Sequence, residues 1–180
     1  IVVYNTYQMY RHDKLANLKA DHLIAREVGF ILGVKMVRGA YMEKERKRAE
    51  EMGYPSPIQP TKEATDIDYN ESLRYCIQHI EDIAFVCGTH NEESSRLLAE
   101  LMDQNDIPHD HHHVYFAQLL GMSDNLSFNL SEAGYNVAKY VPYGPIKAVM
   151  PYLFRRAQEN TSIAGQTSRE FSLVKKELER

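Results

Sequence analysis

Apolar runs alternate with polar, helix-forming stretches along most of the chain. The apolar runs are short and rich in β-branched and aromatic residues, which is typical of strands; they cover residues 1–7, 30–37, 83–87, 114–117 and 137–141. The run at 30–37 is apolar almost throughout, as in strands that are covered on both faces. We therefore expect about five strands.

The polar stretches between these runs carry helix signals. A helix is predicted over 13–28, where the stretch stops at Gly29, and a charged helix over 43–52, followed by a proline-rich loop at 54–60. Asn91 stands before two glutamates, as a helix N-cap does. One further helix shows a regular apolar face, made by Tyr69, Leu73, Cys76, Ile77 and Ile80.

The last predicted helix begins at Gly144-Pro145, because proline suits the first helical position. Its spacing predicts a buried stripe on one side. The stripe consists of Ile146, Val149, Met150, Leu153 and Ala157.

Strands that alternate with helices indicate a parallel sheet of βαβ units. The pattern alone leaves open whether this is an open, doubly wound sheet or part of a (β/α)8 barrel. In both architectures ligands bind at the carboxyl ends of the strands, so the polar residues that follow each apolar run are the candidates for chemistry.

Length and composition limit the class of protein. With 180 residues, of which 43% are hydrophobic, we expect a single domain over 1–180. A net charge of −4 provides no basic field for a nucleic acid. No apolar run approaches the roughly 18 residues of a membrane-spanning helix. Cys76 and Cys87 lie in apolar elements, which suits buried free thiols.

Two cations follow the second strand. Lys35 and Arg38 stand at its exit, and Gly39 would let a ligand approach the backbone. A basic group beside an electron-accepting ring or a phosphate stabilises negative charge. The alternative is a strand end solvated by its own cations.

Two further groups invite a functional interpretation. Thr89 and His90 end the third strand just before a capped helix, although a histidine there is often structural. On the last helix, Arg155 and Arg156 could grip a carboxylate while Glu159 holds an ammonium group, which together would recognise an amino-acid zwitterion. The alternative is an exposed helix with ordinary ion pairs.

The run from His109 to His113 contains four histidines and an aspartate, but it lies in a loop without a second ligand cluster, so we expect no native metal. The glycines show neither a dinucleotide fingerprint nor a P-loop spacing. A nucleotide cofactor would have to be held in another way.

The chain resembles the proline dehydrogenase family across nearly its whole length. The segments that carry the resemblance are Lys35-Met36-Val37-Arg38-Gly39-Ala40-Tyr41, Thr89-His90-Asn91, Tyr115 to Met122, Tyr140 to Pro145 and Tyr152 to Asn160. The family has a distorted (β/α)8 barrel of the TIM type with FAD at the carboxyl ends of its strands. The resemblance implies that this chain holds about five βα units from the C-terminal half of that barrel.

The resemblance also implies roles for single residues. Lys35 would stand near flavin N5 as the catalytic cation. The cofactor contacts would be Asn5, Arg38, Gly39, Ala40, Thr89 and His90. Arg155 and Arg156 would bind the proline carboxylate, with Glu159 near the ring nitrogen. The wall around the ring would comprise Tyr41, Leu119, Tyr140 and Tyr152.

The implied reaction is the oxidation of L-proline to Δ1-pyrroline-5-carboxylate, with a hydride passed to flavin N5 and electrons then passed to a quinone or another acceptor. The implied location is a bacterial cytoplasm with peripheral association at the inner membrane face, or alternatively the mitochondrial matrix. Lysine at position 35 and arginine at position 38 resemble the eukaryotic-type branch, whereas many bacterial relatives exchange the two.

Three rival interpretations stay open. Hydroxyproline dehydrogenase shares the fold, although a tyrosine at the position of Tyr140 would crowd a 4-hydroxyl group. Another flavin-dependent barrel reductase would instead accept electrons from a nicotinamide cofactor. Finally, because the first three strands of the barrel are not recognisable and Ile1 begins within a strand, we expect a fragment, which could be a non-catalytic piece that only assembles with other copies.

Overall fold

The computed structural model describes residues 3–162, 175, 176, 178 and 179. The chain divides into two compact units, residues 1–141 and 142–180. Each unit is described by itself below. A single domain over 1–180 stays a prediction.

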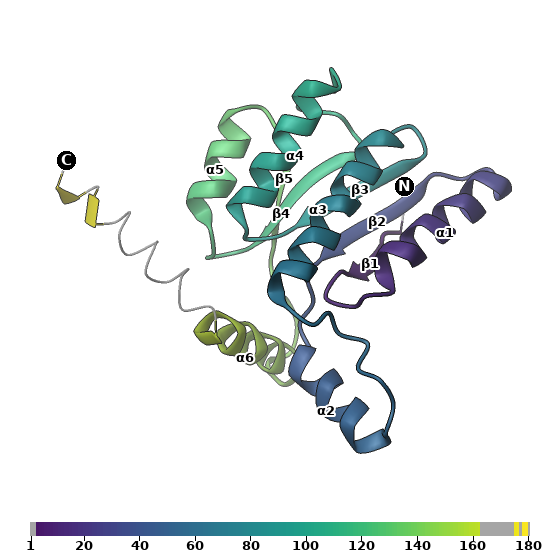
Figure 1. Cartoon of the computed structure of the whole chain (residues 1–180). Coiled ribbons are helices and arrows are strands. Elements are labelled where there is room, and N and C mark those ends of the chain that lie inside the picture. Colours follow the sequence, from purple (N-terminus) through teal and green to yellow (C-terminus); the bar gives the residue numbers. More distant parts are fainter. Residues whose placement is uncertain (1–2, 163–174, 177, 180) are drawn as a thin grey trace. The chain divides into compact units, whose positions relative to one another are not determined.

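The first unit is a five-stranded parallel sheet with helices between the strands (Figure 1). Its strands are β1 (Asn5–Gln8), β2 (Leu32–Val37), β3 (Ile83–Gly88), β4 (Val114–Leu119) and β5 (Val137–Tyr140). Its helices are α1 (Lys14–Val28), α2 (Met42–Met52), α3 (Lys62–Gln78), α4 (Glu92–Gln104) and α5 (Asp124–Glu132). The second unit contains α6 (Ile146–Ser162).

The order of the strands resolves the alternative that the sequence pattern left open. The strands pair in the order β1-β2-β3-β4-β5, all parallel, without a reversal. A doubly wound sheet reverses its order at a switch point and so places helices on both faces. Here α1, α3, α4 and α5 lie on one face of the sheet (Figure 1). With right-handed crossovers, this is the arrangement of consecutive units in a barrel.

Local sequence explains where several helices begin and end. Gly29 adopts a left-handed conformation with φ 86° and its N–H bonds to the carbonyl of Ala25, which ends α1 as predicted. The Asn91 side chain accepts a hydrogen bond from the Ser94 N–H, so the predicted N-cap of α4 is confirmed. Thr61 caps α3 in the same way.

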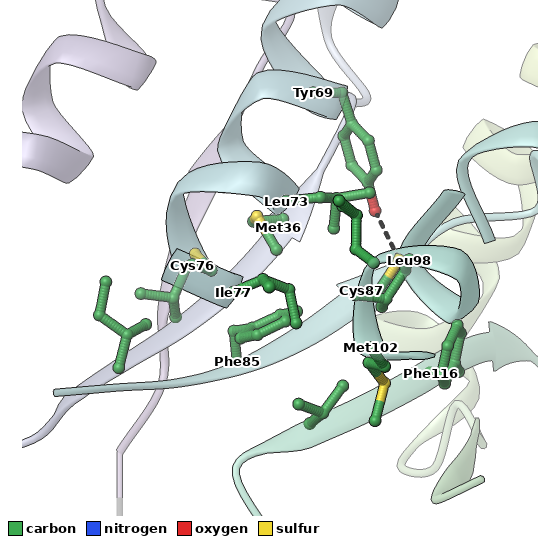
Figure 2. Packing of buried hydrophobic residues seen from close by; sticks show 14 of the residues in the cluster. Met36, Tyr69, Leu73, Cys76, Ile77, Phe85, Cys87, Leu98, Met102 and Phe116 are labelled. Carbon is green, nitrogen blue, oxygen red and sulfur yellow. Dashed lines mark hydrogen bonds between the residues drawn. The ribbon is translucent and has the colours of Figure 1, made fainter. Parts of the chain in front are cut away.

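The core lies between the sheet and its helices (Figure 2). The predicted apolar face of α3 is buried against β3, and Leu98 and Met102 of α4 pack beside it. Cys76 and Cys87 are free thiols in this core, as predicted. Burial raises the pKa of Cys87 to about 11, and the Tyr69 hydroxyl lies 3.4 Å from its Sγ. Buried thiols with raised pKa values are unreactive.

The structure differs from the sequence predictions in two places. No helix was predicted between the fourth and fifth strands, yet α5 lies there and buries Leu126 and Leu130. Of the predicted buried stripe of α6, Val149 is partly buried, whereas Ile146 is 78% exposed and Leu153 is 38% exposed. Periodicity marks an apolar side of a helix, but burial also needs a partner surface.

Candidate functional site

The candidate site lies at the carboxyl edge of the sheet. Because the strands are parallel, all five carboxyl ends meet at this edge. The side chains of β2 alternate between its two faces, so Val34 and Met36 are fully buried under the helices while Lys35 is only partly buried. Lys35 therefore points to the face without helices, which we call the inner face.

Lys35 and Tyr140 converge on the inner face. The Lys35 Nζ lies 5.2 Å from the centroid of the Tyr140 ring, although β2 and β5 are not neighbours in the sheet. Three strand spacings would separate them by roughly 14 Å in a flat sheet. Leu119 is the register partner of Tyr140 on β4 and shares its face. The structure thus brings together one predicted catalytic residue and two predicted wall residues.

Asn5 does not lie on the inner face with Lys35 and Tyr140. It pairs with Val34, so it lies on the side of the sheet that the helices cover. The prediction that Asn5 contacts a flavin therefore has no support from its position. Gln8 instead pairs with Val37 at the end of β1, on the face of Lys35. Gln8 is one of the polar residues that follow the first apolar run, which the sequence marks as candidates for chemistry.

The Arg38 side chain is held by four groups of the protein. Its Nε donates to Asp66 Oδ1 over 2.6 Å, its Nη1 to Thr89 Oγ1 over 2.8 Å and its Nη2 to Ser94 Oγ over 2.9 Å. Its guanidinium carbon lies 4.3 Å from the centroid of the Tyr69 ring. The side chain therefore ties β2 to α3, β3 and α4. These three bonds use one N–H on each nitrogen of the guanidinium group.

The Asp66 carboxylate, which binds Arg38, has a second basic partner in Lys62. Burial of Asp66 would raise its pKa, but hydrogen bonds from Lys62 and Arg38 outweigh that effect and lower the pKa below its ordinary value. Asp66 thus stays ionised at neutral pH. No sequence signal marked it, since it lies 28 residues from Arg38 along the chain on another element.

Gly39 follows with a backbone that favours glycine. Its φ is 126°, and a Cβ there would clash with the ring of Tyr10. The Tyr10 N–H in turn bonds to the carbonyl of Arg38. Ala40 and Tyr41 continue into α2, with Tyr41 39% exposed. The predicted Arg38-Gly39-Ala40 segment is therefore an ordered turn at the carboxyl edge.

Thr89 and His90 link the ends of β3 and β4. The Thr89 hydroxyl accepts the Arg38 bond and a second bond from the Asn91 N–H, and the Thr89 carbonyl accepts from the Gln118 amide. His90 Nδ1 lies 3.1 Å from the hydroxyl of Ser123. Thr89 is buried, so its side chain is part of the scaffold of the edge.

The second unit carries the predicted substrate arginines. In α6, the guanidinium carbons of Arg155 and Arg156 lie 6.0 and 5.0 Å from the centroid of the Tyr152 ring. Both arginines are partly buried. Glu159 belongs to the same helix, but its side chain lies outside the described residues. Within its unit, the helix thus groups two guanidinium groups around one aromatic ring.

The loop histidines have protein partners. His109 lies 2.8 Å from the Ala133 carbonyl and His113 lies 2.7 Å from the Ile80 carbonyl through their Nδ1 atoms. These contacts indicate structural roles for both histidines.

No described helix combines the length and apolar character that crossing a lipid bilayer requires.

Comparison with known proteins identifies the family. The model of the proline dehydrogenase family matches residues 2–169. The chain belongs to the proline dehydrogenase family. The mitochondrial proline dehydrogenase 1 of Homo sapiens is 45% identical over 180 residues, which cover 98% of this chain and 30% of the human protein. A hydroxyproline dehydrogenase of Xenopus laevis is 42% identical, over 99% of this chain and 39% of that protein.

Solved structures of proline dehydrogenase relatives agree with the fold. The proline utilization A (PutA) protein of Bdellovibrio bacteriovorus superposes with a TM-score of 0.81 and 28% identity, over 87% of this chain and 16% of that chain. The five parallel βα units are therefore part of a TIM-type barrel, as the resemblance implied. The chain spans less than two fifths of the length of the curated relatives described above.

Proposed function

We propose that the protein carrying this chain oxidises L-proline to Δ1-pyrroline-5-carboxylate with FAD, in proline catabolism. Family membership supports the reaction class. The observation that carries the proposal is the position of Lys35, a cation on the inner face at the carboxyl edge, beside Tyr140. In barrels of this type, that edge is where the chemistry takes place.

The carboxyl edge fits a flavin cofactor. Lys35 and Gln8 share the inner face, and the turn at Gly39 follows β2 at the same edge of the sheet. We assign the cofactor contacts to Lys35, Gln8 and the Arg38-Gly39-Ala40 backbone, with Thr89 and His90 supporting them from β3. When bound, FAD accepts the hydride from the ring carbon of proline. The chain itself supplies position and charge.

Lys35 would act as the catalytic cation. Its ammonium group would stabilise negative charge that develops on the flavin ring as the substrate is oxidised. The neighbouring phenol of Tyr140 offers its π face to the ammonium, which holds Lys35 over the inner face. No comparable cation comes from β4 or β5 on that face, since Lys139 is bonded to Asp124 and the Met122 carbonyl.

The residues proposed to recognise the substrate are assigned within each unit separately. In the second unit, Arg155 and Arg156 would bind the proline carboxylate through paired hydrogen bonds, Glu159 would hold the ring nitrogen, and Tyr152 would contact the pyrrolidine ring. In the first unit, Tyr41, Leu119 and Tyr140 are proposed as contacts of that ring. Binding the substrate in a fixed position beside the reactive groups removes the entropic cost of bringing them together, which accounts for much of enzymatic rate enhancement.

The partners and location follow from the same proposal. Electrons would leave the reduced cofactor for a quinone or another acceptor, with the enzyme associated peripherally with a membrane. Relatives from Homo sapiens, Drosophila melanogaster and Arabidopsis thaliana are named mitochondrial, which favours the mitochondrial matrix over a bacterial cytoplasm.

Hydroxyproline dehydrogenase is the second candidate. The relative from Xenopus laevis that carries this name is 42% identical to the chain. Against it stands Tyr140, whose ring lies beside Lys35 on the inner face and would crowd a 4-hydroxyl group. The ratio of kcat/KM for L-proline to that for 4-hydroxyproline separates the two functions.

The experiment that tests the main proposal is a flavin titration. The chain is incubated with FAD, unbound cofactor is removed, and visible absorbance is recorded before and after L-proline is added without oxygen. Bound flavin that bleaches with proline supports a working dehydrogenase. An unbleached flavin that NADPH reduces instead would favour a barrel reductase, and a colourless oligomer would favour a non-catalytic assembly piece.

A further inference from the structure

A polar cluster lies at the end of the sheet opposite the candidate active site. His22 of α1 is only 1% exposed, so its imidazole is a polar ring inside the core. The cluster is completed by His79 at the C-terminus of α3 and by Asp82, the residue before β3. One donor atom from each of the three residues lies within 4.8 Å of the other two.

The orientation of His22 is fixed by a neighbour. Its Nδ1 lies 2.7 Å from the Tyr75 hydroxyl, whereas its Nε2 lies 3.4 Å from Asp82 Oδ2. A histidine that ligates a metal commonly uses its second ring nitrogen for such a bond, which sets the tautomer and the ring orientation. His22 thus has one nitrogen anchored and the other directed into the cluster.

The two other residues are held by a closed backbone turn. The N–H groups of Asp82 and Ile83 both bond to the His79 carbonyl, over 3.0 and 2.9 Å. The Leu32 N–H bonds to the Asp82 carbonyl, which fixes the turn to β2. The His79 and His22 rings lie 4.7 Å apart between centroids. Because these bonds hold the backbone, the cluster adjusts by rotation of its side chains.

We propose that His22, His79 and Asp82 form a Zn²⁺ site that joins α1, α3 and the start of β3. Two imidazoles and a carboxylate are a ligand set that Zn²⁺ accepts, with a water in the fourth position. Zinc–ligand bonds of about 2.1 Å require ligand atoms about 3.4 Å apart, so the cluster must contract. His79 and Asp82 are partly exposed and can rotate inward, while His22 stays in place.

Arg26 competes with the metal for Asp82. Its Nε lies 3.3 Å from Asp82 Oδ2, the oxygen that also approaches His22. Arg26 is 57% exposed, so its side chain can swing into solvent when an ion arrives. Removing its charge should therefore strengthen binding.

The test is calorimetric titration of the full chain with ZnCl₂ after treatment with a chelator. We expect one equivalent of Zn²⁺ per chain. His79→Gln should weaken its binding by more than about 10-fold, which corresponds to about 1.4 kcal/mol. Tyr75→Phe should weaken it by roughly 10- to 100-fold, as loss of an outer-shell bond does. Arg26→Gln should tighten it.

Controls distinguish this site from the loop histidines. His112→Gln removes an exposed imidazole of the loop and should leave the affinity unchanged. Circular dichroism checks that His79→Gln folds, and Co²⁺ absorbance in the visible range gives a second readout of the ligand geometry. An unchanged zinc affinity in His79→Gln, or a weakened one in His112→Gln, would overturn the proposal.

Discussion

Arg38 Nη1 donates a hydrogen bond to the Thr89 hydroxyl over 2.8 Å, and this bond joins the carboxyl ends of β2 and β3. The same guanidinium binds Asp66 and Ser94, so one side chain connects four elements around the candidate site. A planar group with donors in fixed directions suits this task, and a lysine could not reproduce it.

Replacing Arg38 should therefore destabilise the first unit. Arg38→Met removes a bond to an ionised partner and leaves Asp66 partly buried, with only Lys62 to balance its charge. We expect a loss of about 2 kcal/mol in the free energy of unfolding, measured by chemical denaturation. Arg96→Met is the matched control, because Arg96 is a fully exposed arginine with its own carboxylate partners. Equal losses in both variants would argue against the role of Arg38.

The lowered pKa of Asp66 makes the stability of the folded state depend on pH. Its folded pKa lies below the ordinary value of 3.8, so the folded state binds this proton less readily than the unfolded state. The stabilisation is fully present above about pH 4 and is lost as the pH falls through the folded pKa. Asp66→Asn should therefore flatten the acid limb of the stability curve.

Asp68 provides the contrast, because burial raises its pKa in the folded state. For this carboxyl group the folded state is favoured by protonation, and stability is lost as the pH rises through the raised pKa. Asp68→Asn should therefore steepen the net loss of stability on acidification. Denaturant midpoints between pH 3 and pH 7 give the measurement. Identical slopes in the two variants would contradict the assignments.

We expect position 39 to tolerate no residue other than glycine. In Gly39→Ala, the new Cβ would meet the Tyr10 ring and would also require a left-handed backbone. We expect a loss of more than about 2 kcal/mol in the free energy of unfolding. Gly53→Ala is the control: Gly53 has φ 71° but open space around its Cβ, so only about 1 kcal/mol should be lost. Thermal unfolding of both variants decides whether the Tyr10 contact matters.

Sequence reasoning identified the strands, most helices and their order because burial and capping leave local signals. The apolar run of β2 and the Asn91 cap of α4 are examples. It missed α5, a helix of nine residues with several serines and asparagines, whose helical tendency is weak on its own. Leu126 and Leu130, four residues apart, were the only periodic signal.

The candidate site was harder to predict, because its geometry depends on contacts between distant elements. Lys35 could be identified as a strand-end cation, but its approach to Tyr140 depends on how β2 and β5 lie relative to each other. Asn5 and Gln8 are both polar and lie on opposite faces of β1 because side chains alternate along a strand, and the register with β2 shows which of them shares the face of Lys35. The sequence marked Arg38 as a strand-end cation, but it gave no sign of the three protein acceptors that its side chain binds.

The proposed carboxylate clamp predicts a specific kinetic defect. Arg156→Lys keeps the positive charge but loses the planar pair of donors that binds a carboxylate through two hydrogen bonds. If about 1.4 kcal/mol of binding is lost, the KM for L-proline should rise about 10-fold while kcat changes less. Steady-state kinetics of the flavin-loaded enzyme gives both constants. Arg48→Lys, an exposed position on α2, should leave them unchanged. An unchanged KM in Arg156→Lys would exclude Arg156 from the clamp while leaving the flavin site at Lys35 intact, because the two lie in different units of the chain.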